Sequence, residues 1–467
     1  MTEPTIEALR RAREHAERFL EGLDDRPVAA RASVAELREQ LDVGLSDEGV
    51  DPVRVIDELA AAVDGGLLGS TGGRFFAWVI GGNLPSSLAA DWLTSTWDQN
   101  AAMNSTSPAV GVVEEVVGAW LLELLDLPRE SSFALTTGCQ MAHFTALSVA
   151  RAQVLRDAGW DVNEDGLCGA PPIRVLTSEH RHASVDRAVR LLGLGNKSMI
   201  ALETDGDGRI RPAALEHALD EGASPTVVVL DAADLNIAAF DDFTTLIPLA
   251  KAKGAWVHVD GAFGLFARAS RTKRHLLDGV EAADSWATDG HKWLNVPFDC
   301  GVAMVKDAEA HRNAMTVTAS YIAANKGARD EIDWNPEWSR RARAIPVYAA
   351  LRELGKRGLE ELIDRTCAHA EAIVDGVGAL DGAEVVWRPR LNQGLVRFLD
   401  PTPSATTEAH DARTDAVIAA INDSGEAFFS GTTWEGRRAM RVSVVNWRTT
   451  SVDVERVVAA VRRALDS

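Results

Sequence analysis

Four groups of residues that could do chemistry each follow a stretch predicted to be a buried strand. In chain order, they are the turn TTGCQ with Gly138, Cys139 and Gln140, the stretch SEHRHASV with His180 and His182, the carboxylate Asp260 after AWVHV, and the pair His291 and Lys292 in DSWATDGHKW. In open α/β sheets, ligands gather at the carboxyl ends of the strands. Free backbone N–H groups in a glycine turn suit a phosphate, whereas a buried lysine is costly unless it is paired or chemically bonded.

Each group taken singly also has an ordinary structural interpretation. Glycine turns are common in α/β loops, and both histidines could be solvated loop residues. Asp260 could cap a helix, and Lys292 could extend from the strand end into solvent. The sequence contains no HExxH motif or other metal-binding spacing, so metal ligation is the least favoured role of the histidines.

Taken together, the four groups match the needs of one cofactor, pyridoxal phosphate. This cofactor needs a lysine for a Schiff base, an anion that keeps its ring nitrogen protonated, a flat cover for its ring and N–H groups for its phosphate. Nucleotide cofactors are less favoured, because no GxGxxG follows a strand and no GxxxxGK[ST] is present. The sequence therefore predicts pyridoxal phosphate as the cofactor.

Composition limits the partners that this protein could have. The 467 residues include 69 acidic and 48 basic side chains, which give a formal net charge of -21. Without a local basic patch, this charge disfavours nucleic acid and anionic membranes, and a small-molecule substrate is expected. The four cysteines form no CxxC pair, and the charged N-terminus has the pattern of neither a signal peptide nor a membrane span. We therefore expect a cytoplasmic enzyme.

Apolar strands that alternate with helices predict the elements that must position these residues. The expected strands in the first two thirds of the chain are residues 131–137, 172–178, 226–232, 255–261 and 301–307. Strands that are apolar almost throughout imply a mostly parallel sheet covered on both faces, and hence an α/β fold.

Three parts of the chain are predicted from these patterns. Residues 1–72 should form amphipathic helices, with Ser33 and Asp51 as N-caps, that pack against a partner subunit. Residues 73–377 should form the large cofactor-binding α/β domain, and residues 378–467 a small α+β domain.

The motifs also carry a family resemblance. HVDGAFG, followed by DSWATDGHKWLNVPFDCG, resembles the signature of the pyridoxal-phosphate-dependent group II amino-acid decarboxylases, and the resemblance extends from about RFFAWVIGGNLP to VNWRTT. This family includes aromatic-amino-acid, histidine and glutamate decarboxylases. The resemblance implies the aminotransferase-type fold, fold type I, and a homodimer with sites at the subunit interface. It also implies that an L-amino acid loses CO2 through a quinonoid intermediate and becomes an amine.

The resemblance implies a role for each candidate residue. Lys292 matches the lysine that forms the Schiff base, Asp260 the aspartate that pairs with the ring nitrogen, and His182 the histidine that stacks on the ring, which leaves His180 as a bystander. The remaining matches are Ala262, the small residue under the ring, the phosphate-binding turn Gly138, Cys139 and Gln140, and His291, which also touches the phosphate.

The sequence departs from the family pattern in three places. LDAADLNIAAFDD replaces the usual GTTxxGxxD, and Asp289 with Gly290 replaces the commoner asparagine and proline before His291. In the loop over residues 316–338, Trp334 lies nearest to the position of the tyrosine that protonates the carbanion. Of the two tyrosines of the chain, Tyr348 falls in the helix beyond this loop, whereas Tyr321 lies within the loop and is the alternative proton donor. Amine formation is favoured, and an aldehyde-forming oxidative decarboxylation or another lyase reaction of the same fold is the alternative.

Two signals for the substrate conflict. Phe75, Phe76, Trp78 and Trp97 lie in the segment that lines the substrate pocket in the family, which favours an apolar side chain, although they could equally be core or interface residues. Arg441 lies where glutamate-type members place an arginine that binds a carboxylate, which favours an acidic substrate. A catalytically silent binding protein is disfavoured, because such a relative has no need to keep Lys292, Asp260 and His182 together.

Overall fold

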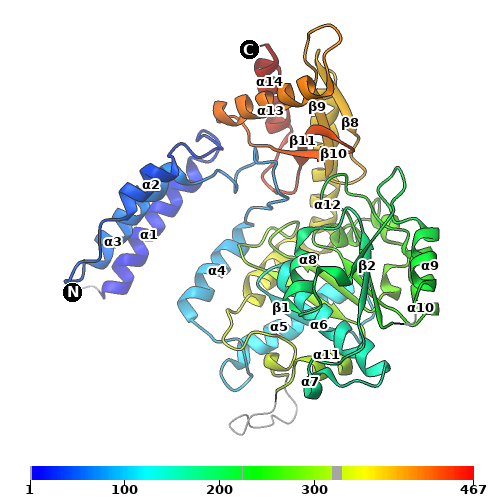
Figure 1. Cartoon of the computed structure of the whole chain (residues 1–467). Helices are drawn as coiled ribbons and strands as arrows, with labels where there is room; N and C mark the ends of the chain where they lie inside the picture. Colours follow the sequence, from blue (N-terminus) through cyan, green and yellow to red (C-terminus); the bar gives the residue numbers. More distant parts are fainter. Residues whose placement is uncertain (1–2, 223, 318–328, 467) are drawn as a thin grey trace.

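A seven-stranded sheet forms the centre of the computed structural model, which describes residues 3–222, 224–317 and 329–466 (Figure 1). In sheet order, the strands are β1 (Ser132–Thr136), β7 (Gly301–Val305), β6 (Ser285–Asp289), β5 (Trp256–Asp260), β4 (Thr226–Asp231), β2 (Arg174–Ser178) and β3 (Met199–Leu202). Only β7 among these strands runs antiparallel to its neighbours. The prediction of a mostly parallel α/β sheet is confirmed.

Helices cover both faces of this sheet, and its central strands β4, β5, β6 and β7 are buried along their whole length. One face packs against α6 (Cys139–Asp157), α8 (Ala183–Leu191) and α11 (Ala308–Met315), and the other against α5 (Pro108–Leu124), α9 (Pro212–Asp220) and α10 (Phe243–Ala252). In β4, Val227 and Val229 belong to the first layer, whereas Val228 and Leu230 belong to the second. The parallel strands β2, β4, β5 and β6 therefore bring their carboxyl ends to one edge, as the predicted site requires.

The N-terminal arm consists of α1 (Pro4–Glu21), α2 (Val34–Leu41) and α3 (Pro52–Val63), which pack on one another at the edge of the molecule (Figure 1). The predicted N-caps are confirmed: Ser33 forms a capping box with Glu36, and Asp51 accepts hydrogen bonds from the first turn of α3. None of the three helices has a buried residue. Helix α4 (Pro85–Trp97) then leads into the large unit. The short helix α7 (Val162–Asp165) lies in the connection between α6 and β2.

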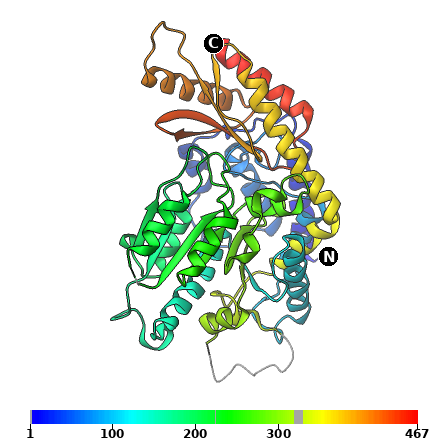
Figure 2. The same ribbon diagram turned by 90° about the vertical axis from the view of Figure 1, so that its right-hand side faces the viewer.

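The C-terminal unit has its own antiparallel sheet and core. The sheet order is β10 (Ser430–Trp434), β11 (Arg437–Ser443), β9 (Gln393–Phe398) and β8 (Ala383–Trp387), and the sheet packs with α13 (Thr407–Ser424) and α14 (Ser451–Asp466). The long helix α12 (Ala344–Gly378), yellow in Figure 2, connects it to the large unit. This helix is interrupted at Gly355, whose φ of 58° is not helical. Phe76 and the last turns of α12 belong to this core, although the sequence assigned them to the large unit.

Among the residues described, no helix combines the length and the apolar character needed to cross a bilayer.

Candidate active site

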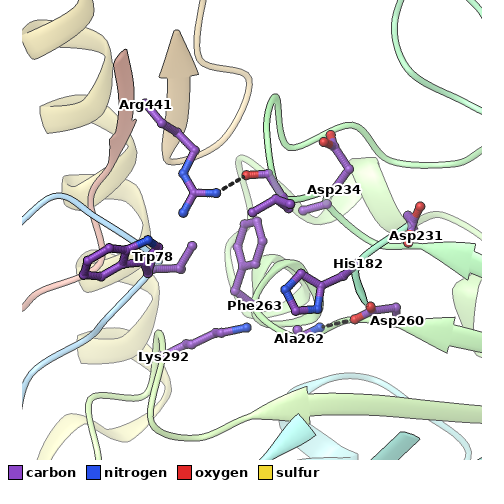
Figure 3. A pocket seen from close by; sticks show the side chains of 12 residues that line it. Trp78, His182, Asp231, Asp234, Asp260, Ala262, Phe263, Lys292 and Arg441 are labelled. Atoms are coloured by element: carbon purple, nitrogen blue, oxygen red, sulfur yellow. Dashed lines mark hydrogen bonds between the residues drawn. The ribbon is translucent and has the colours of Figure 1, made fainter. Parts of the chain in front are cut away.

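A cavity opens at the carboxyl ends of β4 and β5, between the large unit and the C-terminal sheet (Figure 3). Its lining comes from both units and consists of Trp78, Val79, His182, Asp231, Ala233, Asp234, Leu235, Asp260, Ala262, Phe263, Lys292 and Arg441. Trp78 and Val79 are both left-handed, with φ of 54° and 59°. This conformation is unusual for a bulky or β-branched residue and is typical of functional sites.

Lys292 enters the cavity from the turn that follows β6. Its Nζ lies 3.1 Å from Oδ2 of Asp289, and the side chain is 20% exposed. Burial alone would lower the pKa of the Lys292 ammonium, but the carboxylates of Asp289 and Asp260 raise it above its ordinary value. The amine is therefore accessible and paired with a carboxylate.

Asp260 is the last residue of β5 and is 6% exposed. Oδ1 accepts a hydrogen bond from the Ala262 backbone N–H at 3.1 Å, and Oδ2 lies 3.3 Å from Nε2 of His143. Burial alone would raise the pKa of Asp260, but the neighbouring His143, His182 and Lys292 together lower it well below its ordinary value. The structure therefore holds an anion at this strand end. It is not a helix N-cap, because a 3-10 helix begins only at Gly264.

The two histidines of the β2–α8 loop occupy different surroundings. His182 lines the cavity beside Asp260, and its Nδ1 caps α8 by accepting from the Ser184 N–H (Figure 3). His180 instead packs against Trp434 of the C-terminal sheet, with ring centroids 4.6 Å apart. The structure thus brings His182, and not His180, to the cavity.

The glycine turn lies beside the cavity at the N-terminus of α6. Gly138 has a φ of 87°, and a Cβ at this position would lie 3.3 Å from Cε1 of His291. The Cys139 N–H donates to Oδ1 of Asp289 at 2.6 Å, and Nε2 of Gln140 is buried with no hydrogen-bond partner among the described residues.

His291 lies beside the glycine turn and can offer its Nε2–H as a hydrogen-bond donor. Its Nδ1 accepts from the Cys300 N–H at 3.2 Å, and burial lowers the pKa of the ring. A neutral His291 must therefore carry its proton on Nε2. The unpartnered Gln140 amide, the cradle kept open by Gly138 and the His291 N–H fit the phosphate of pyridoxal phosphate, while Asp260 and Lys292 fit its ring nitrogen and aldehyde.

Arg441 reaches the cavity from β11 and faces Lys292 across it (Figure 3). It is 4% exposed, and Nη1 donates to the Leu235 carbonyl at 3.0 Å. Burial lowers the pKa of the guanidinium to about 10, and Nε has no hydrogen-bond partner in the described chain. The nearby Asp234 carboxylate already accepts from three backbone N–H groups and forms no ion pair with Arg441.

Several predicted site residues lie outside this cavity. Phe76 is fully buried in the C-terminal core and stacks on Phe429, so the structure places it outside the cavity lining. Trp334 packs between His311 and Arg329, away from the cavity lining. Trp97 lines a separate apolar recess on α4 and α5.

Tyr348 does not line this cavity. Tyr348 also lines the apolar recess and stacks on Trp120 at 5.1 Å. Tyr321 lies outside the described residues.

The sequence analysis missed other lining residues, chiefly Asp231 and Phe263. Asp231 ends the apolar strand β4 as Asp260 ends β5, and the two residues are partners in the parallel ladder. Asp231 could therefore have been identified from the sequence in the same way as Asp260, as a carboxylate at the end of an apolar strand. Burial and the carboxylates of Asp241, Asp260 and Asp234 raise the pKa of Asp231 well above its ordinary value, whereas the pKa of Asp260 is lowered.

The sheet and the cavity together define a pyridoxal-phosphate enzyme of fold type I. Residues 35–399 match the family model described as "Pyridoxal-dependent decarboxylase conserved domain", and the chain belongs to this family, the group II amino-acid decarboxylases. The predicted family, cofactor and fold type are confirmed, and so is the class of reaction: the protein catalyses pyridoxal-phosphate-dependent decarboxylation of an L-amino acid.

The individual relatives act on different amino acids. The chain is 31% identical over 386 residues to L-2,4-diaminobutyrate decarboxylase of Rhizobium meliloti (strain 1021), a match that covers 80% of this chain and 74% of the relative. It is 27% identical over 448 residues to aromatic-L-amino-acid decarboxylase of Bacillus atrophaeus, covering 94% and 91%. The crystal structure of Oryza sativa TDC with PLP and tryptamine superimposes with a TM-score of 0.92 at 23% identity, over 98% of this chain and 97% of that one.

Proposed function

We propose that the substrate is an acidic L-amino acid and that Arg441 binds its side-chain carboxylate, with the amine as product. The observation that supports this is a buried guanidinium in the cavity that has no carboxylate partner among the described residues and an unused Nε donor. A buried cation is costly unless it is paired, so an anionic ligand group is the natural partner. The aromatic signal is weaker, because Phe76 and Trp97 lie outside the cavity.

The leaving α-carboxylate is a poorer partner for Arg441. It loses its charge as CO2 departs, so an ion pair with Arg441 would stabilise the substrate more than the transition state. A side-chain carboxylate keeps its charge throughout and can hold the substrate in place without opposing the reaction.

The same proposal assigns the other cavity residues. When bound, pyridoxal phosphate supplies an electron sink for the pair left at Cα as CO2 departs. Lys292 would bind the aldehyde carbon covalently, Asp260 would hold the proton on the ring nitrogen, and His182 would cover the ring face above Ala262. The phosphate would bind at Gly138, Cys139, Gln140 and His291.

We also propose that the protein is a homodimer. The arm exposes apolar side chains, among them Val34, Val43 and Leu45, and α4 exposes Trp92 and Trp97 beside the apolar recess. Apolar patches of this kind on a protein surface are typical of subunit interfaces. The mass in solution tests this, and a monomer at micromolar concentration would refute it. The cytoplasmic location stays a prediction.

A substrate panel with variants of Arg441 tests the function. Purified holoenzyme is assayed with aspartate, glutamate, diaminobutyrate, phenylalanine and tryptophan, and CO2, amine, aldehyde and peroxide are measured. We expect amine from an acidic substrate, and a loss of about 2 kcal/mol, or roughly thirtyfold in kcat/KM, in Arg441→Met. Arg438→Met is the matched control, because Arg438 lies on the same strand but pairs with Asp415 at the surface.

Two outcomes would contradict this proposal. Turnover of aromatic substrates alone, with equal kcat/KM in wild type and Arg441→Met, would show that Arg441 does not select the substrate. Aldehyde with peroxide as the main products would replace amine formation by oxidative decarboxylation.

A further inference from the structure

A chain of four hydrogen-bonding side chains leads to Asp260, on the face of β5 that packs against α6. Trp256, His258 and Asp260 alternate along β5, so their side chains emerge on the same face. Ser285 of β6 is the ladder partner of His258, and His143 comes from α6, the helix that begins at the glycine turn. His143, His258 and Ser285 are completely buried, and the sequence analysis singled out none of them.

The contacts run without a break from the indole to the carboxylate. Nε1 of Trp256 donates to Oγ of Ser285 at 2.9 Å, and this oxygen lies 2.9 Å from Nδ1 of His258. Nε2 of His258 lies 2.9 Å from Nδ1 of His143, with the two rings edge to face. Nε2 of His143 lies 3.3 Å from Oδ2 of Asp260.

Every arrangement of the protons that satisfies this chain directs an N–H of His143 at Asp260. An indole N–H can only donate, so the Ser285 hydroxyl accepts from Trp256 and can donate to His258. Burial, together with His143, lowers the pKa of His258 to about 3, so the ring is neutral and carries its proton on Nε2. His143 then accepts at Nδ1 and presents its own N–H to Asp260. The opposite direction would aim a lone pair of neutral His143 at the carboxylate.

This N–H matters because Asp260 is buried. Burial alone drives a carboxyl group toward its neutral form, and a neutral Asp260 could not stabilise a positive ring nitrogen. The Ala262 N–H satisfies the other carboxylate oxygen. Sγ of Cys139 also lies 3.4 Å from Nε2 of His143, but burial raises the pKa of this thiol well above its ordinary value, and a neutral thiol is a weak acceptor.

We propose that His143 is a positioning residue that keeps Asp260 ionised and aimed at the ring nitrogen of the cofactor, and that His258 and Ser285 fix the tautomer of His143. This inference rests on the proposed role of Asp260 and adds a mechanism that sustains it. The alternative is that the two histidines are satisfied core residues with no influence on the cofactor.

The test reads the ring nitrogen directly. Holoenzyme is reconstituted with pyridoxal phosphate labelled with 15N in the ring, and the 15N chemical shift reports its protonation. In His143→Leu we expect the signal to move toward the deprotonated position and turnover to fall about tenfold or more, as for a change of one pKa unit. His143→Gln, which can still donate to Asp260, should stay near wild type.

Ser285→Ala and His311→Gln complete the set. Ser285→Ala removes the hydroxyl that donates to His258. Because His258 and His143 lie between Ser285 and Asp260, we expect a smaller movement of the 15N signal in the same direction. His311 is also completely buried but lies between Ser132 and Trp334, so its variant should leave the signal unchanged. If His143→Leu does not fold, Ser285→Ala decides the question.

Asp260→Asn distinguishes a failure of the proposed role of Asp260 from a failure of the role inferred for His143. Wild-type shifts in folded, loaded His143→Leu or Ser285→Ala would overturn the inference, provided that Asp260→Asn moves the signal. If Asp260→Asn itself leaves the 15N signal unchanged, the proposed role of Asp260 fails, and the inference fails with it.

Discussion

Replacing Asp260 with asparagine removes a charge from the cavity while preserving its shape. The side-chain carbonyl of asparagine can still accept from the Ala262 N–H, which lies 3.1 Å from Oδ1 in the wild type. The residue is 6% exposed, so water cannot replace the lost charge at the ring nitrogen. The variant therefore isolates the electrostatic contribution of Asp260 from its packing.

The expected loss of turnover is at least a hundredfold. A positioned acid or base typically contributes two to four orders of magnitude, and a hundredfold change corresponds to about 2.7 kcal/mol in the activation free energy. Asp231→Asn is the matched comparison, because Asp231 is the ladder partner of Asp260 but its pKa is shifted upward, toward the neutral form that an amide resembles. We expect it to lose less than tenfold.

The assay is CO2 release under saturating amino acid, normalised to the cofactor content measured by absorbance. Normalisation separates turnover from loading, because a variant that binds less pyridoxal phosphate would otherwise look inactive. If fully loaded Asp260→Asn stays within tenfold of wild type, or loses no more than Asp231→Asn, the reasoning about ring protonation is refuted.

Three further predictions concern the scaffold. In Gly301→Ala, a Cβ would lie 2.2 Å from the backbone carbonyl carbon of Gly138, in the glycine turn proposed to bind the phosphate. We therefore expect the Kd for pyridoxal phosphate, measured by absorbance titration, to rise at least about tenfold, whereas Gly206→Ala, in open space, should leave it unchanged. Glu114→Gln removes one partner of the fully buried pair with Arg340, which should lower the free energy of unfolding in urea by about 3–5 kcal/mol; a loss below 1 kcal/mol would contradict this. Burial lowers the pKa of His311 to about 3 in the folded protein, whereas a histidine in the unfolded chain has a pKa of about 6.5. As the pH falls from about 6.5 toward 3, the unfolded chain therefore binds a proton that the folded protein does not, and the free energy of unfolding should decrease. Urea melts of wild type and His311→Gln at pH 7.5 and 5 should show a smaller pH dependence in the variant, and equal slopes would refute the assignment.

Local patterns were enough to predict the elements that carry the cofactor-facing residues. The apolar runs before Asp260 and Lys292 became β5 and β6, because buried parallel strands leave little freedom in composition or length. The short strand β3 was not predicted, since four residues with partial exposure give no clear period. In the C-terminal unit, Phe428 pairs with Phe75 of a distant segment, and β10 begins only at Ser430.

Contacts between distant parts of the chain set the limit of the prediction. Phe76 lies two residues from Trp78, yet one side chain fills the C-terminal core and the other lines the cavity, and nothing local distinguishes them. His143 was missed because it lies on a helix of small and apolar residues, and its importance comes from a neighbour 115 positions away. An aspartate at a strand end is visible in the sequence, whereas the groups that sustain its charge are not.

The two sheets divide the site in a way that bears on how this enzyme could be re-engineered. Lys292 and Asp260 belong to the large unit. Arg441 reaches the cavity from β11, a strand of the C-terminal sheet whose neighbouring residues pack in a separate hydrophobic core. Side chains on β11 can therefore be exchanged with little disturbance of the reaction centre. On the proposal that Arg441 binds the side chain of the substrate, libraries confined to this strand should yield altered substrate preference while retaining decarboxylation. The group proposed to select the amino acid lies on a different sheet from Lys292 and Asp260.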